Sequence, residues 1–482
     1  MQKSSLLRNG IWVTAGNFSR RFFALFSNLI LARLLVPDDF GIVSIAWVFW
    51  SFFILFTQNS TSLFILYKGI DEKPYLDTTY TVSLAAGAIT SLLLVVSSPI
   101  ISNFFSEPAL SSLLIVYAFN LFLASGYFPY SAVLMRQERY AVLALNTLIA
   151  SGFRLSFTIG AALLGLRYWS FAIGDMAFWS VEFILVIIRS NAYLKIRLHP
   201  EIVREVVSYC SGAIGSSFGF YVNSNLDNFI VGRLLGKASL GYYNLAYQLS
   251  MALTTILNPI MNQVGTPEFA KIDKPADQKK ALIAVIRQLA YLTTPFYLII
   301  FLILDKKAIA FIFGQNWTQI AHILPWLLSA SYFRVINAPL KTMLSARGFP
   351  GINAKVNLCI APIAILSFWM GAKLGNVVGV AISAAVVLGF FWTLLWWWIG
   401  CRSLHWPMYE ILGTALKPIV FSLLALVLSY AISYWVFDLF LGSKIIIFIL
   451  TYVFLIYLLS PEQFFEYAQV FKKLVRKLRL VK

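Results

Sequence analysis

The sequence predicts an all-α, polytopic membrane protein of about fourteen transmembrane helices. Three observations lead to this fold class. Hydrophobic residues make up 60% of the 482 residues and charged residues only 12%, a composition outside the range of water-soluble globular domains. The mean hydropathy is +0.78. Apolar runs of about 18 or more residues recur from one end of the chain to the other, and each is long enough to cross a bilayer.

The apolar runs define the expected spans in order along the chain. Short polar or charged connections mark the ends of each span to within about three residues. The first run follows a short basic segment that has no small-residue cleavage pattern, so we expect it to be a permanent span. The expected spans are 10–34, 41–66, 79–101, 110–134, 140–164, 169–188, 206–231, 241–264, 281–304, 320–344, 353–372, 377–399, 411–437 and 445–459.

The distribution of basic residues predicts the orientation of the chain. Of 38 lysines and arginines, 24 fall in segments on the N-terminal side of the expected spans and eight on the opposite side. Positively charged short loops remain in the cytoplasm, so both termini are expected there. The net charge of +18 therefore reports topology, and a nucleic-acid partner is not expected.

Three scattered cysteines and three isolated histidines give no metal-site spacing.

An internal repeat divides the first twelve spans into two sets of six. Residues 28–35 align without gaps with residues 228–235, and Gly41 then falls on Gly241. At an offset of 210, Pro129 falls on Pro339. Chance agreement among apolar residues is the alternative, but the shared Arg-Leu-Leu followed six residues later by Gly favours duplication. Because six is an even number, the two copies enter the membrane in the same direction, related by an axis along the membrane normal.

This repeat predicts two six-helix lobes in parallel orientation around a central cavity, plus two extra C-terminal helices. The expected boundaries are 1–200 for the first lobe, 201–402 for the second, 403–460 for two peripheral helices and 461–482 for a basic amphipathic tail on the cytoplasmic side. The tail suits a helix on the anionic inner leaflet. An ordinary positively charged stop signal explains it equally well.

Five cations fall deep within the expected spans. Each would cost about 2.5–3.5 kcal/mol if it faced lipid at the bilayer centre, so we expect them to face protein or water. Only three acidic residues, Asp175, Glu182 and Asp227, lie at similar depth, and full pairing would leave two cations unpaired. An excess of wet guanidinium groups suits an anion such as a phosphate. The expected cationic cavity residues are Arg20, Arg21, Arg154, Arg334 and Lys341.

Structural roles for these charges remain open in the sequence. Pairs such as Arg154 with Glu182, or Arg21 with Asp175, would simply hold helices together. Arg20 and Arg21 are about 100° apart on a helix, so one cavity would receive only one of them fully. Asp227 stands among asparagines and is a candidate for coupling to a proton or a sodium ion, with an interhelical ion pair as the alternative.

Several motifs resemble those of a known superfamily. The segment Ala32-Arg33-Leu34-Leu35-Val36-Pro37-Asp38-Asp39-Phe40-Gly41 resembles the opening motif of the Wzx-like polysaccharide exporters of the MOP flippase superfamily. The segment 227–247 is similar to the second-repeat signature of that family, and Phe313-Gly-Gln-Asn-Trp317 and Ser345-Ala-Arg-Gly348 resemble its later loops. The resemblance covers nearly the whole chain and points to exporters of the colanic-acid or teichuronic-acid type.

The resemblance implies a flippase with two lobes that work by alternating access. It implies an undecaprenyl-pyrophosphate-linked oligosaccharide as cargo, no cofactor, and a polymerase and glycosyltransferases as pathway partners. Ser19-Arg20 resembles the first-span arginine of lipid II flippases, but Phe26 and Ser27 stand where those carry a further Arg-Asp pair. The alternatives are a MOP-type drug or cation exporter, which needs an acidic interior, and a membrane enzyme of polysaccharide assembly, which needs a large loop or an acidic catalytic cluster.

Overall fold

The computed structural model describes residues 2–261, 265–303, 305–435 and 441–463, and these residues form helices and connections without a strand. The α-helices are α1 (Gln2–Leu34), α2 (Pro37–Phe53), α3 (Gln58–Lys68), α4 (Lys73–Phe105), α5 (Ala109–Arg136), α6 (Tyr140–Leu163), α7 (Trp169–Ser190), α8 (Pro200–Ser250), α9 (Ala252–Ile260), α10 (Thr266–Ala270), α11 (Pro275–Ile303), α12 (Lys306–Phe313), α13 (Ile320–Ala346), α14 (Pro350–Ser383), α15 (Trp392–Leu404), α16 (Met408–Trp435) and α17 (Leu441–Leu459). Short helices η1 (Ile54–Phe56), η3 (Gln315–Trp317) and the π-helix η4 (Ala384–Phe391) complete the order. The predicted all-α fold is confirmed.

The helix ends follow the expected spans closely, but two expected connections are bends within longer helices. α8 bends at Gly236 (φ 80°), between the spans expected at 206–231 and 241–264. α14 bends at Gly375 and Asn376 (φ 52°), between the spans expected at 353–372 and 377–399. A positive φ is a conformation that glycine and asparagine adopt at low cost, so these residues allow a turn without a loop.

Eight helical stretches among the described residues are long and apolar enough to cross a membrane. The number fourteen therefore stays a prediction. Three long helices, α1, α8 and α13, are not among the eight, and each carries charged and amide residues along its length. These same helices contribute polar and charged residues to a pocket described below.

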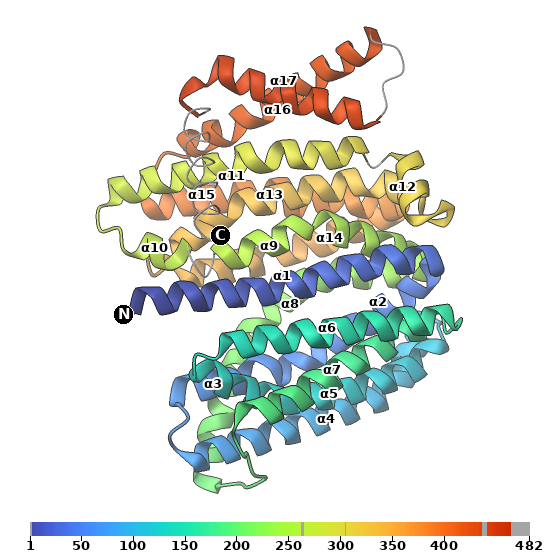
Figure 1. The fold of residues 1–482 in the computed structure, drawn as a ribbon, viewed down its shortest axis with the longest axis vertical. Helices are drawn as coiled ribbons and strands as arrows, with labels where there is room; N and C mark the ends of the chain where they lie inside the picture. Colours follow the sequence, from blue (N-terminus) through green and yellow to red (C-terminus); the bar gives the residue numbers. More distant parts are fainter. Residues whose placement is uncertain (1, 262–264, 304, 436–440, 464–482) are drawn as a thin grey trace, which may run out of the picture.

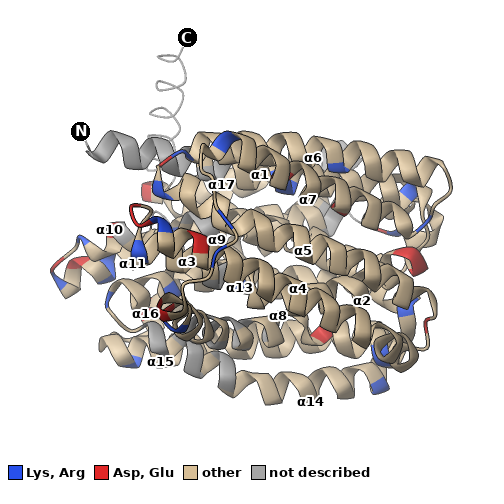
Figure 2. Cartoon of the chain, turned by 90° about the horizontal axis from the view of Figure 1, so that it is seen from below, with Lys and Arg blue, Asp and Glu red and all other residues tan. Residues whose placement is uncertain are grey.

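The helices form two bundles on either side of α1 and α8 (Figure 1). Helices α2 to α7 make the first bundle, and α9 and α11 to α15 make the second, with α16 and α17 on its outer edge. Tyr291 of α11 packs there beside Phe421, Phe448 and Tyr452. Charged residues gather toward the two ends of the bundle and leave a largely uncharged middle (Figure 2). The basic tail predicted from residue 461 lies outside the described residues from 464 onward.

The first part of α8 packs against the first bundle, although the boundary predicted at residue 200 assigns it to the second. The Tyr221 hydroxyl donates to the Val48 carbonyl at 2.8 Å. Near the start of α8, Glu205 accepts a hydrogen bond from Lys68 at 2.8 Å, which lowers the pKa of the Glu205 carboxyl below its usual value. After the bend at Gly236, the helix continues into the second bundle, so α8 links the two.

The bundles meet at the end of the molecule where α1 joins α2 and where α8 bends, which we call the junction end. Gly41 of α2 and Gly241 of α8 allow two backbones to touch there. A Cβ atom on Gly41 would lie 1.8 Å from the Lys237 carbonyl oxygen, and one on Gly241 would lie 1.9 Å from the Pro37 carbonyl oxygen. The two contacts exchange residues at the same offset of 200 as the sequence repeat, as expected of two copies related by a two-fold axis.

The motif residues around Gly41 stabilise the junction end through hydrogen bonds, an ion pair and ring packing. Pro37 begins α2 with the fixed φ that suits a first helical turn, and the Val36 N–H donates to the Asp39 carboxylate at 3.3 Å. Asp39 also pairs with Arg167 at 3.2 Å. Phe40 packs edge-on against Trp317, with ring centroids 4.8 Å apart, and the Trp317 indole donates to the Ala32 carbonyl at 2.6 Å.

Candidate functional site

Arg20 and Arg21 lie side by side in α1 and line two different pockets. Arg21 lines a pocket of about 700 Å³ between α1, α8, α9, α13 and α15. Arg20 lines a pocket of about 740 Å³ between α1, α3, α5, α6 and α7. Consecutive residues are about 100° apart on a helix, so the two side chains leave α1 in different directions. Arg21 therefore lines one of these pockets and Arg20 the other.

The pocket beside Arg21 carries three of the five expected cations, Arg21, Arg334 and Lys341, and we call it the cationic pocket. None of the described residues that line it is an aspartate or glutamate. Its polar lining is neutral: Ser224, Asn225, Tyr247, Gln248, Thr254, Thr255, Asn258 and Ser345. A pocket with three cations and neutral hydrogen-bonding groups favours an anionic ligand.

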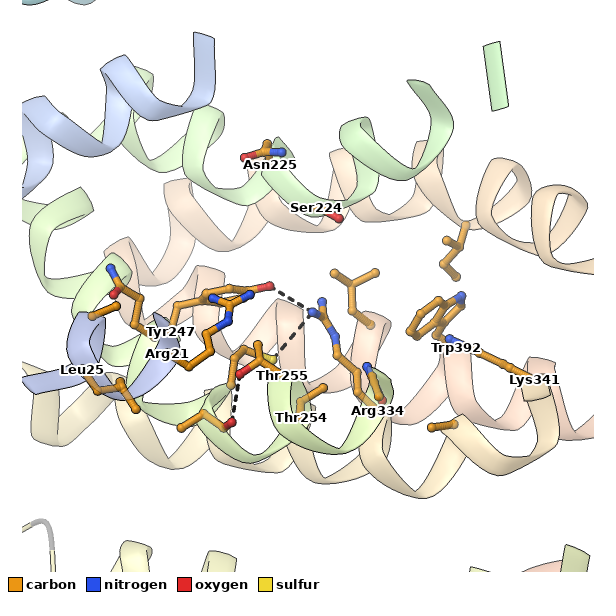
Figure 3. Close-up of a pocket in the computed structure, with 18 of the residues that line it drawn as sticks. Arg21, Leu25, Ser224, Asn225, Tyr247, Thr254, Thr255, Arg334, Lys341 and Trp392 are labelled. Atoms are coloured by element: carbon orange, nitrogen blue, oxygen red, sulfur yellow. Dashed lines mark hydrogen bonds between the residues drawn. The ribbon is translucent and has the colours of Figure 1, made fainter. Parts of the chain in front are cut away.

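Arg334 is held by neutral hydrogen-bond partners. Its Nη1 donates to the Tyr247 hydroxyl at 3.0 Å and approaches the Met251 sulfur at 3.8 Å, while Nε has no hydrogen-bond partner among the described residues. Figure 3 shows Arg21 and Arg334 directed toward the same Tyr247 side chain. Two guanidinium groups directed into one pocket offer planar, forked hydrogen-bond donors to a phosphate.

Lys341 lies further along the same pocket, against an aromatic wall. Its ammonium is 3.7 Å from the centroid of the Trp392 ring and 5.1 Å from that of Trp396. An indole face stabilises a cation without neutralising it, so the positive charge stays available to a ligand. Ser224 and Asn225 of α8 lie on the opposite wall in Figure 3.

Arg154 lines neither pocket, and the structure pairs it with an acid. Its Nε lies 2.6 Å from Asp175 Oδ1 in α7. The other carboxylate oxygen accepts hydrogen bonds from the Tyr117 hydroxyl at 3.0 Å and the Trp47 indole at 3.1 Å. The sequence suggested ion pairs between Arg154 and Glu182 and between Arg21 and Asp175, and both pairings are wrong. Both acids lie on α7, so the register of α6 against α7 decides the partner: it places Arg154 beside Asp175 and Thr147 beside Glu182.

Asp227 is buried in α8 beside two tyrosines. Its Oδ2 accepts from the Tyr243 hydroxyl at 2.8 Å and its Oδ1 from the Asn228 N–H at 2.8 Å. The Tyr243 ring stacks on Tyr247, with centroids 6.3 Å apart, and Tyr247 accepts from Arg334. A short series of side chains therefore connects Asp227 to the cationic pocket.

The pocket beside Arg20 differs in chemistry, and we call it the mixed pocket. Glu182 is 2% exposed and its Oε1 accepts from the Thr147 hydroxyl at 2.7 Å. Its Oε2 has no hydrogen-bond partner among the described residues. Aromatic side chains, including Tyr127 and Trp179, form much of the remaining wall. One arginine faces two acids here, Glu182 and Glu138, so this pocket has no cationic excess.

Sequence reasoning missed the neutral residues that complete the cationic pocket, chiefly Tyr247 and Trp392. Tyr247 was visible only as part of a repeat signature, and Trp392 was not singled out. Tyr247 lies four residues before Met251 and Trp392 four residues before Trp396, so each pair shares a helix face. Nothing in the local pattern separates such residues from ordinary core aromatics.

Comparisons with known proteins identify the family. A family model described as "Polysaccharide biosynthesis protein" matches residues 30–322, more than half of the chain. The chain belongs to this polysaccharide biosynthesis family. The resemblance to Wzx-like exporters that the segment 32–41 suggested is confirmed.

Two curated relatives of this family are similar over most of the chain. The lipopolysaccharide biosynthesis protein WzxC of Escherichia coli (strain K12) is 21% identical over 84% of this chain and 82% of that protein. The teichuronic acid biosynthesis protein TuaB of Bacillus subtilis (strain 168) is 24% identical over 67% of this chain and 64% of that protein. With these bacterial relatives and its many apolar helices, the family member described here is a multi-pass membrane protein.

Solved structures show the same fold. The lipid II flippase MurJ in an inward closed conformation superposes with a TM-score of 0.76 at 14% identity, over 94% of this chain and 99% of that one. An inward-facing multidrug resistance MATE family transporter of the MOP superfamily superposes with a TM-score of 0.62 at 16% identity, over 80% and 94%. At these identities the likeness concerns the fold, and the MOP fold expected from the sequence is confirmed.

Proposed function

We propose that this protein is a flippase that carries a lipid-linked oligosaccharide with a phosphate-bearing head across the bacterial cytoplasmic membrane. The observation that supports it most is the cationic pocket, in which Arg21, Arg334 and Lys341 face one cavity without an acidic residue in its described lining. Cations kept unpaired at this depth are costly unless a wet cavity or an anion stabilises them. A diphosphate presents several acceptor oxygens that match two guanidinium forks.

The names of the relatives point to the same cargo class. WzxC and TuaB are named for lipopolysaccharide and teichuronic acid biosynthesis, and ExoT of Rhizobium meliloti is named a succinoglycan biosynthesis transport protein, 21% identical over 87% of this chain. Such polymers are built from sugar units that must leave the cytoplasm. We infer undecaprenyl-pyrophosphate oligosaccharide as the load, moved from the inner to the outer leaflet by alternating access.

The orientation and partners of the protein follow from this proposal. The basic loops favour cytoplasmic termini, which would make the junction end the outer end of the molecule. Glycosyltransferases that assemble the load and a polymerase that consumes it are the expected pathway partners. The protein itself is proposed to transport without catalysing a covalent step and without a cofactor. A cationic cargo is disfavoured because the cationic pocket would repel it.

The first experiment tests the cargo pocket. Purified protein in proteoliposomes is given a polyprenyl-pyrophosphate oligosaccharide in one leaflet, and arrival of the sugar in the other leaflet is followed with an impermeant sugar-modifying reagent. Replacing both Arg21 and Arg334 by Ala should lower the rate at least tenfold, because each charge-assisted hydrogen bond contributes about 1.5–3 kcal/mol. Arg402→Ala, which removes an arginine beside Trp398 outside both pockets, is the matched control and should transport normally. Wild-type rates in the double variant would reject the cationic pocket as the cargo site.

The second experiment tests ion coupling at Asp227. We propose that this carboxylate couples transport to a proton or a sodium ion, because its Tyr243 and Tyr247 neighbours connect it to Arg334. Transport into proteoliposomes should rise with an imposed proton or sodium gradient in the wild type, and Asp227→Asn should abolish that dependence while keeping gradient-free exchange. Transport that ignores both gradients in both proteins would remove Asp227 from the mechanism.

A further inference from the structure

The mixed pocket lies beside Arg20 of α1 and the cationic pocket beside Arg21, and the flippase proposal gives the mixed pocket no role. It has a volume of about 740 Å³, within the range of ligand pockets. The two pockets are separated by one helix, whose consecutive arginines Arg20 and Arg21 each line one of them. Any ligand anchored beside Arg21 would therefore have a second pocket within reach on the far side of α1.

The lining of the mixed pocket combines flat aromatic rings with neutral and acidic hydrogen-bonding groups. The rings of Tyr127 and Trp179 are 5.9 Å apart and nearly perpendicular, so they form a corner of the wall. Polar side chains from three helices face the same space. They are Asn17 from α1, Gln58 and Ser62 from α3, and Thr147 from α6. Amide and hydroxyl groups both donate and accept, as the many hydroxyls of a sugar require.

Glu182 is the group in this pocket that most needs a ligand. The carboxylate is almost fully buried, and one oxygen is already bound by Thr147. The other oxygen, Oε2, lacks a hydrogen-bond partner among the described residues, and a buried acceptor without one destabilises the fold, more so when it is charged. A sugar hydroxyl that donates to Oε2 would remove that cost.

We propose that the mixed pocket is a saccharide subsite, in which Glu182 accepts a hydrogen bond from a sugar hydroxyl while the aromatic corner contacts the apolar face of the ring. This inference rests on the proposed function and deepens it. The phosphate groups bind in the cationic pocket, and the sugars bind across α1 in the mixed pocket. The two parts of the cargo are assigned to the two pockets by charge. The three cations of the cationic pocket suit phosphate, whereas the one arginine and two acids of the mixed pocket suit neutral hydroxyls.

The test compares two probes on the purified full-length protein in lipid nanodiscs. One probe is the polyprenyl-pyrophosphate oligosaccharide extracted from cells that make the protein, and the other is the same polyprenyl pyrophosphate without sugar. Glu182→Gln keeps the shape of the side chain but changes one acceptor oxygen to a donor. It should weaken binding of the sugar-bearing probe about tenfold and leave the sugar-free probe unchanged. Arg334→Ala should weaken both probes.

Each outcome separates the subsite from the flippase proposal. If Glu182→Gln changes neither probe, or changes both equally, the saccharide subsite is wrong although the phosphate site stands. If wild-type protein binds neither probe, the proposed function itself fails. Thr147→Val is the second variant, since it removes the hydroxyl that holds Oε1 and should give a smaller loss confined to the sugar-bearing probe. Thermal unfolding of each variant confirms that the fold is intact.

Discussion

Arg154 and Arg334 both lie near the middle of a helix, but their different surroundings give them different roles. Arg154 meets Asp175, whose carboxylate also binds Tyr117 and Trp47, so this pair lies in a satisfied network inside the first bundle. Arg334 meets only neutral partners and lines a pocket. Removing the cation that pairs with a buried acid strongly destabilises the fold. Removing a cation that lines a pocket instead removes a contact to the ligand.

Replacing Arg154 by Ala should therefore act on stability. The expected loss is about 3–5 kcal/mol in the free energy of unfolding, because Asp175 would remain as an uncompensated buried charge. Thermal unfolding of the detergent-solubilised protein measures it. The double variant Arg154→Met with Asp175→Asn should recover much of the loss, since it removes both charges. A fully stable Arg154→Ala protein that fails to bind the polyprenyl-pyrophosphate probe would instead give Arg154 a role in cargo binding.

At the scale of elements, the crossing of α2 over α8 depends on two glycines. Gly41 and Gly241 let each helix touch a backbone carbonyl of the other, where any side chain would collide. The flanking features are specific to this junction: the proline start of α2, the Asp39 cap and Phe40 against Trp317. Three of the four motif segments that resemble the exporter family, 32–41, 227–247 and 313–317, thus meet at one place, although they lie up to about 280 residues apart in the chain.

Gly41→Ala should disrupt this crossing. The new Cβ atom would overlap the Lys237 carbonyl oxygen, so α2 and α8 must move apart, and overpacking of this kind costs about 1–3 kcal/mol. Thermal unfolding should show the loss. Gly152→Ala in α6 is the matched control, because no atom lies within 4 Å of its added Cβ and alanine favours the helix. Equal stability of the two variants would mean that the crossing is looser than the structure has it.

At the scale of the whole molecule, the junction end is closed and holds the two bundles together. Lys237 of α8 pairs with Glu107, next to α4, at 2.8 Å, and Arg33 of α1 donates to the Ile312 carbonyl of α12 at 2.8 Å. If the protein works by alternating access, these contacts must break when this end opens. Partly exposed contacts of this kind are individually weak, which suits contacts that form and break in each cycle.

Locking this end should stop transport. With Cys210, Cys359 and Cys401 replaced by Ser or Ala, the variant Glu107→Cys with Lys237→Cys is treated with a cleavable bismaleimide. Transport of the polyprenyl-pyrophosphate oligosaccharide should fall to background after crosslinking and return after cleavage of the linker. Either single-cysteine variant, treated in the same way, should remain active. Full transport by the crosslinked protein would show that the two bundles need not separate at the junction end.

The sequence alone determined the all-α membrane fold, most helix positions and the family, because hydrophobic runs and turn residues are local features that need no tertiary contact to be recognised. It also determined which cations are deep, from their distance to the span ends. It did not determine their partners, because Arg154 pairs with Asp175 and not with the Glu182 that the sequence suggested. Both acids lie on α7, so the register of α6 against α7 decides this pair, whereas the meeting of α1, α8, α9 and α13 decides which cations share a pocket. Both depend on how side chains of different helices pack, which only the tertiary structure establishes.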